Sequence, residues 1–171
     1  IIPRTDLAKA SGLPCERGIL VSDCMQSYDP KIYAVGECAQ HRGIAYGLVA
    51  PLFDQAKVCA NHLAEMGIAQ YQGTVLSTKL KVTGVSLFSA GDFMGGEDTQ
   101  NILYFDAPQS IYKKLVLKDD VLIGAVMYGA TQDGSWYFDL IQSGANVADF
   151  RNNLIFGRGF CIDADSLDEA A

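Results

Sequence analysis

Apolar residues in the first 68 positions recur in short strand-like runs and in one helical stripe. Residues 18–21 and 32–35 are short runs rich in aliphatic and β-branched side chains, which predicts two strands. Asp29-Pro30 supplies the turn before the second run. Further along, a spacing of alternately four and three positions predicts one amphipathic helix. Its apolar stripe consists of Leu52, Ala56, Cys59, Leu63 and Met66.

Capping and breaking residues mark the helix ends in this half. Thr5 or Asp6 suits the start of a short helix that runs to residue 10, and Gly12 closes it. Pro51 suits the first turn of the longer helix, and Gly67 its end. The order strand, glycine, loop, helix is typical of the ligand-binding end of an α/β sheet.

From residue 78 onward, strand patterns dominate. Residues 79–91 alternate, and the alternation changes phase across Gly84, which predicts a β-bulge. Asp119-Asp120 suits a tight turn between strands. The last strand is nearly continuous in apolar residues, which places it in the centre of a sheet. The further strands are predicted at residues 102–105, 111–117 and 121–128.

Two short helices are expected after the strands. Ser135 is expected to cap one that ends at Gly144, and Asn146, with Asp149 three residues later, to cap one that ends at Gly157. Strands followed by helices indicate a small α+β module rather than a βαβ repeat. The predicted fold is therefore α/β in the first half and α+β in the second.

Four segments follow from this pattern. Residues 1–68 form the α/β part, and the polar stretch 69–77 is expected to be a linker. Residues 78–160 form the α+β part, and residues 161–171 an acidic tail. The chain begins without methionine, on apolar residues that run into a proline, so we expect it to be a piece of a longer protein.

Charge and composition exclude several classes of partner. The formal charge is −7, whereas binding to a phosphate backbone needs clustered Lys and Arg, so nucleic acid and anionic membranes are not expected partners. No apolar run reaches the roughly 20 residues of a membrane span, and there is no signal-peptide pattern. A cytoplasmic location is therefore expected.

The cysteines and histidines predict neither a metal site nor a catalytic triad. Five cysteines form no C-x-x-C pair, and their odd number argues for reduced thiols rather than a disulfide framework. His41 and His62 are the two histidines, and neither has a neighbour in sequence that would orient it.

The stretch IYAVGECAQHRG, residues 32–43, is the strongest candidate for chemistry. If residues 32–35 are a buried parallel strand, Gly36 and Glu37 lie just past its carboxyl end, where α/β sheets bind ligands. Gly36 would let the backbone approach a cofactor, and Glu37 would accept a hydrogen bond from a sugar or ribityl hydroxyl. The helix near Pro51 would favour negative charge on that ligand. An ordinary strand-end glycine with a solvated glutamate explains the same four-residue pattern equally well.

Three motifs in order carry a family resemblance over about residues 1–160. GECAQHRGIAYGLVAPL is followed by TKLKVTGVSLFSAGD and then by KKLVLKDDVLIGAVMYG. They resemble FAD-dependent reductases with two dinucleotide-binding domains, and more narrowly the large subunits of NAD(P)H-dependent nitrite reductases and the NADH–rubredoxin reductases. The first half then resembles the final FAD-binding segment, and the second the reductase C-terminal domain.

The resemblance implies an FAD site of which this chain holds a part. The implied cofactor-binding residues are Gly36, Glu37, Ala50, Pro51 and Lys81, and no catalytic or metal-binding residue is implied. It also implies NAD(P)H, iron–sulfur clusters and sirohaem in the parent protein, outside this chain. The chain alone is expected to be inactive, with FAD and the remainder of the parent as partners and a homodimer as a further option.

Alternatives remain at two levels. Within the class, the parent could pass electrons to rubredoxin or a similar carrier. From another class, residues 72–160 could serve as an interaction or dimerisation module that does not touch flavin. Cys38 is expected to be a packed small residue rather than a redox thiol. His41 and Arg42 are expected either to touch the cofactor or to fix the loop, and Lys79 and Lys81 to lie on an exposed strand face or near the flavin.

Overall fold

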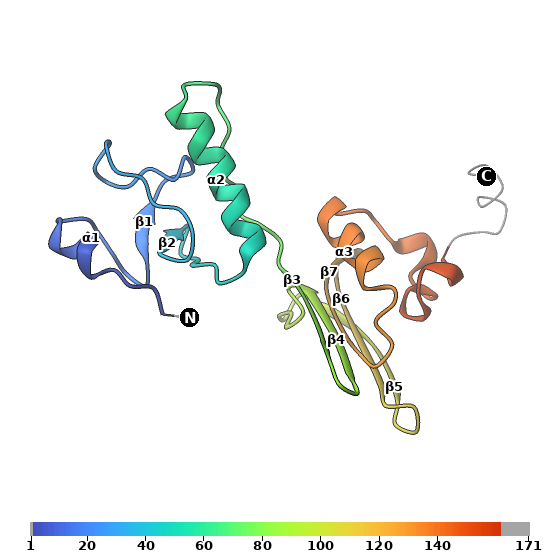
Figure 1. The fold of residues 1–171 in the computed structure, drawn as a ribbon. Helices are drawn as coiled ribbons and strands as arrows, with labels where there is room; N and C mark the ends of the chain where they lie inside the picture. The colour runs from blue at the N-terminus through green and yellow to red at the C-terminus, as the bar shows by residue number, and fades with distance from the viewer. Residues whose placement is uncertain (1, 162–171) are drawn as a thin grey trace. The chain divides into compact units, whose positions relative to one another are not determined.

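The computed structural model of the chain describes residues 2–161. These residues form two compact units, and the boundary lies between Leu76 and Ser77. Figure 1 shows the helix α2 in the first unit and the large sheet in the second. Within the described residues, no helix is both long and apolar enough to cross a membrane.

Two short strands and two helices make up the first unit. Helix α1 (Asp6–Ala10) and strand β1 (Ile19–Val21) confirm the predictions for these segments. Strand β1 pairs in parallel with β2 (Ala39–His41), and helix α2 (Val49–Leu63) follows. The fully or nearly buried side chains of this core are Met25, Tyr46, Cys59 and Tyr71.

The strand predicted at residues 32–35 is wrong. This segment makes a single bridge, Gln26 to Tyr33, across the Asp29-Pro30 turn. Val35 remains 39% exposed. The partner of β1 is instead β2, whose Ala, Gln and His have little preference for strands but are all buried. Gly36 and Glu37 therefore precede a strand and do not follow one.

Helix α2 begins at Val49, so Pro51 lies in its first turn as predicted, but its buried face differs from the predicted stripe. Pro51, Gln55 and Cys59 are buried at a spacing of four. Leu63 is 60% exposed, and the helix ends there rather than at Gly67. The periodicity of apolar residues misses this face because a polar residue, Gln55, lies at its centre.

The second unit contains an antiparallel sheet in the order β3-β4-β7-β6-β5. Strand β7 has neighbours on both sides, which confirms its predicted central position. Asp119 and Asp120 connect β6 to β7 with φ values of 50° and 57°, the left-handed conformation that a two-residue hairpin turn requires. The strands are β3 (Ser77–Val82), β4 (Val85–Gly91), β5 (Gln100–Asp106), β6 (Ile111–Lys118) and β7 (Val121–Tyr128).

The phase change at Gly84 is a hairpin turn and not the predicted β-bulge. Val82 pairs with Val85, so Thr83 and Gly84 form a two-residue connection between β3 and β4. Gly84 has a φ of 76°, which glycine adopts without strain. The alternation of apolar and polar residues alone cannot distinguish a turn from a bulge, because both shift the apolar positions by one along the sequence. The register of this sheet is instead irregular in β6, between Val116 and Leu117.

Helix α3 (Gly134–Ser143) lies on one face of the sheet (Figure 1). It ends at Gly144, as predicted, but Asp133 occupies the cap position, so Ser135 lies inside the helix. Tyr137 is completely buried, and its hydroxyl donates a hydrogen bond to the Leu154 carbonyl at 2.6 Å. This bond ties the helix to the turns that follow it.

The helix predicted from Asn146 to Gly157 is wrong. Asn146 does act as a cap, because its Oδ1 accepts a hydrogen bond from the Ala148 N–H at 2.9 Å. However, the sequence neighbours Leu154 and Ile155 are both buried, which short turns allow more readily than one helix lying along the sheet. The segment forms three 3₁₀ turns: η1 (Ala148–Phe150), η2 (Leu154–Phe156) and η3 (Arg158–Phe160).

The sheet face opposite α3 carries a row of apolar side chains across all five strands. Directly paired residues share a face, so the register places these side chains side by side. Phe105 is 72% exposed, Leu80 47% and Tyr128 36%. The row consists of Leu80, Leu87, Tyr128, Tyr112 and Phe105, and we call it the open-face row.

Candidate cofactor-binding site

Gly36 is held against helix α2 by its backbone. Its N–H donates a hydrogen bond to Gln55 Oε1 at 2.9 Å, and its φ is 95°. Other residues rarely adopt this φ. A side chain here would meet no atom within 4 Å, so the backbone of Gly36 borders open space. The position therefore offers close backbone approach to a ligand, although it does not follow a strand.

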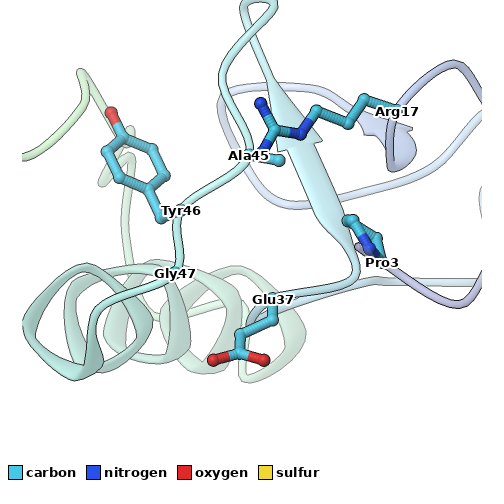
Figure 2. A pocket seen from close by; sticks show the side chains of 6 residues that line it. All are labelled: Pro3, Arg17, Glu37, Ala45, Tyr46 and Gly47. Atoms are coloured by element: carbon cyan, nitrogen blue, oxygen red, sulfur yellow. The ribbon is translucent and has the colours of Figure 1, made fainter. Parts of the chain in front are cut away.

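Glu37 lines a small pocket of about 150 Å³ in the first unit. Figure 2 shows Glu37 and Arg17 beside this pocket on separate segments, and it shows the backbone at Gly47 leading into the helix. The pocket thus combines one carboxylate with one guanidinium, next to the entry to α2. The residues that line it are Pro3, Arg17, Glu37, Ala45, Tyr46 and Gly47.

The N-terminus of α2 has no side-chain cap. Leu48, in the cap position, makes no side-chain capping bond, and the first turn contains no acidic residue. The first N–H groups of any helix lack intrahelical acceptors, and the helix dipole adds a partial positive charge there. Ala50 is exposed in this turn, and Pro51 is buried and has no N–H. This end of α2 therefore favours an anionic or carbonyl oxygen.

Asp23 holds His41 and Arg42 together. His41 Nε2 lies 2.7 Å from Asp23 Oδ1, and Arg42 reaches both carboxylate oxygens at 3.0 and 2.7 Å. The hydrogen bond from Arg42, and next that from His41, lowers the pKa of Asp23 to about 2. No neighbour in sequence orients His41, but the fold brings Asp23 to it from 18 residues away.

Tyr71 connects this cluster to the segment 69–76. Its N–H donates to the Asp23 carbonyl at 2.8 Å, and its ring lies 4.9 Å from that of His41. Burial raises the pKa of the Tyr71 hydroxyl to about 12. Thr74 Oγ1 donates a hydrogen bond to Asp54 on α2 at 2.9 Å, so it accepts the one from the Tyr71 hydroxyl, also at 2.9 Å. The expected linker thus packs onto the first unit.

The remaining candidates lie apart from the pocket. Cys38 is half-buried, and its Sγ lies 3.5 Å from the Val35 carbonyl. Lys79 and Lys81 belong to the second unit, where both are exposed on β3. Among residues 2–161, no three His, Cys, Asp or Glu side chains are grouped so that they could hold a metal ion.

Sequence reasoning missed several residues that shape this site. Asp23 lies 18 residues from His41, and no spacing rule connects them. Arg17 lines the pocket from a loop that carries no motif, and Tyr46 lies within the first family motif but had no role assigned to it. The sequence could have indicated Gln55, because a spacing of four positions places it on the same helix face as Pro51 and Cys59. Its amide is fully buried, and Nε2 has no hydrogen-bond acceptor.

Comparison of the sequence with known families and proteins gives consistent matches. Residues 77–145 match the rubredoxin NAD⁺ reductase C-terminal domain. The chain is 52% identical to a nitrite reductase [NAD(P)H] of Bacillus subtilis, over 87% of this chain and 18% of that protein. It is 37% identical to the nitrite reductase (NADH) large subunit of Escherichia coli, over 90% of this chain and 18% of that protein. The chain therefore spans about a fifth of the length of these relatives.

A solved structure has the same fold. The NADH:rubredoxin oxidoreductase of Clostridium acetobutylicum matches with a TM-score of 0.66 and 26% identity. The match covers 85% of this chain and 38% of that one. It supports the predicted fold class: an α/β segment followed by a small sheet with helices on one face.

Proposed function

Because this chain belongs to the FAD-dependent pyridine nucleotide-disulfide oxidoreductase superfamily, we propose that its first unit forms one wall of a flavin site. The second unit is the C-terminal reductase domain that follows the flavin-binding part. The parent protein is an NAD(P)H-dependent nitrite reductase large subunit, and the 52% identity to the Bacillus subtilis relative supports this choice.

The proposal rests on one observation: the pocket beside Glu37 lies next to the uncapped N-terminus of α2. Glu37 accepts a hydrogen bond from a ribityl hydroxyl of FAD, and Gly36 allows its backbone to approach the cofactor. The first turn of α2, at Ala50 and Pro51, stabilises negative charge on the carbonyl edge of the flavin. Bound FAD supplies a redox group that exchanges a hydride with NAD(P)H and passes on single electrons.

In the parent protein, electrons pass from the flavin to further redox centres. In the parent, iron–sulfur clusters and sirohaem would supply the chemistry that reduces nitrite to ammonia, and no described residue of this chain is assigned to hold them. The resemblance also assigns Lys81, an exposed residue of β3, to cofactor binding. The protein works in the cytoplasm. A reductase that serves rubredoxin or a similar carrier is the alternative within this class, supported by the domain match over residues 77–145.

Substitution of Glu37 tests the flavin proposal in the longer flavoprotein that contains this chain. Glu37→Gln removes the charge of the acceptor, and a hydrogen bond to a charged group contributes about 1.5–3 kcal/mol. The apparent dissociation constant for FAD should therefore rise by about tenfold, measured by fluorescence titration of the apoprotein. Glu65→Gln removes an exposed carboxylate of the same unit and should leave FAD affinity unchanged. Equal FAD affinity in both variants would contradict the assignment of Glu37.

The open-face row supports a second candidate function, association with a second copy of the same protein. A contiguous row with Phe105 at 72% exposure is unusual for a face that meets only water. Phe105→Ser should lower the oligomer mass of the flavoprotein in analytical ultracentrifugation and leave its flavin spectrum unchanged. Phe53→Ser, at a similarly exposed position on α2, is the control. An unchanged mass in the Phe105 variant would contradict this second function.

A further inference from the structure

Lys113 is a buried lysine of strand β6. Its side chain lies on the helix-covered face of β6, the same face as Leu115, and the residue is 6% exposed. Its ammonium approaches one acceptor, the Ile155 carbonyl, at the long distance of 3.5 Å. No carboxylate of residues 2–161 lies within 4.0 Å of it. An ammonium group has three donors, and burying an unpaired charge is costly, so this position calls for an anionic partner.

A cavity lies next to this lysine in the second unit. Its volume is about 190 Å³, and Lys113 is the one charged residue among the described residues that line it. Three aromatic rings of the lining are in contact in sequence order. The centroids of Tyr104 and Phe156 are 6.4 Å apart, and those of Phe156 and Phe160 are 5.9 Å apart. Gln132 adds an amide at the wall. The cavity thus offers one positive charge beside an aromatic surface.

From this combination we propose that the cavity binds a small monocarboxylate with an aromatic or short aliphatic tail. The carboxylate accepts hydrogen bonds from the Lys113 ammonium, which has unused donors, and the tail packs on the three rings. A single cation compensates a single negative charge. A phosphate dianion would bring a second charge that the lining does not neutralise. All residues that line the site belong to the second unit.

Titration of the full 171-residue chain with benzoate tests the site. Backbone amide chemical shifts, followed by NMR, should move saturably at residues of the cavity such as Ile111, Ala130 and Phe160, with a dissociation constant of about 1 mM. Lys113→Met keeps most of the side-chain volume and should weaken binding by at least about tenfold. Lys118→Met removes an exposed lysine of the same strand and should bind benzoate as the unchanged chain does.

Neutral benzyl alcohol provides a second measurement that does not depend on the folding of a variant. It should bind at least about tenfold more weakly than benzoate, because it cannot neutralise Lys113. Equal binding of the two compounds overturns the proposal. Shifts that fall outside the cavity, no saturation by benzoate, or equal benzoate affinity in the folded Lys113→Met variant overturn it as well.

Discussion

The side chains that first suggest chemistry in IYAVGECAQHRG have structural partners. His41 and Arg42 both bind Asp23, and His41 also packs against the Tyr71 ring. This fits the loop-fixing role that the sequence left open for them. The sequence could indicate that the two residues belong together, but Asp23 is brought to them by the pairing of β1 with β2.

The depressed pKa of Asp23 makes the first unit sensitive to acid. The pKa is about 2 in the folded chain against 3.8 for the ordinary group, so the carboxylate stabilises the fold above about pH 4. That stabilisation is lost as the pH falls through the folded pKa. The melting temperature should therefore fall between about pH 4 and pH 2, as measured by circular dichroism.

Asp23→Asn should lower the melting temperature at neutral pH and reduce its change across this acidic interval. The amide cannot form the charge-assisted bonds to Arg42. Glu65→Gln, which removes an exposed carboxylate of the same unit, should follow the unchanged chain at every pH. An Asn variant with the full acid-induced loss would show that Asp23 does not cause it.

Among the helices and strands, the sequence predicted correctly those whose run of apolar residues is visible within the segment itself. Strand β7 lies at residues 121–128 as expected, and it has a neighbouring strand on each side, as its nearly continuous apolar run predicted. The segments 32–35 and 146–157 were predicted wrongly. Their backbone pairing depends on partners elsewhere in the fold, such as the Asp120 carbonyl that accepts the Val147 N–H at 2.8 Å.

Strand β7 also contains a position where only glycine fits. A Cβ at Gly124 would overlap the carbonyl of Asp92, which is backbone and cannot rotate away. Gly124→Ala should therefore destabilise the second unit by about 1–3 kcal/mol, measured by urea denaturation. Gly96→Ala, where a Cβ meets nothing within 4 Å, should change stability by less than about 0.5 kcal/mol. Similar losses in both variants would contradict the close approach.

At the scale of the whole molecule, the proposal assigns this chain one part of a flavin site. Its pocket of about 150 Å³ is smaller than the roughly 300–1,000 Å³ of typical ligand pockets. The printed sequence also contains no G-x-G-x-x-G phosphate-binding motif. The purified 171-residue chain should therefore not retain stoichiometric FAD on gel filtration, and should neither oxidise NADH nor reduce nitrite. A yellow, NADH-oxidising preparation would contradict the proposal that this chain supplies only one wall.

The sequence by itself determined the fold class, the family and most strands of the second unit. These depend on short-range periodicity, turn residues and motifs that remain visible along the chain. The tertiary structure alone decided that Gly36 is tied to Gln55, that Asp23 orients His41 and that Lys113 is buried beside a cavity. Each of these depends on contacts between residues at least 18 positions apart, and spacing along the sequence carries no information about such contacts.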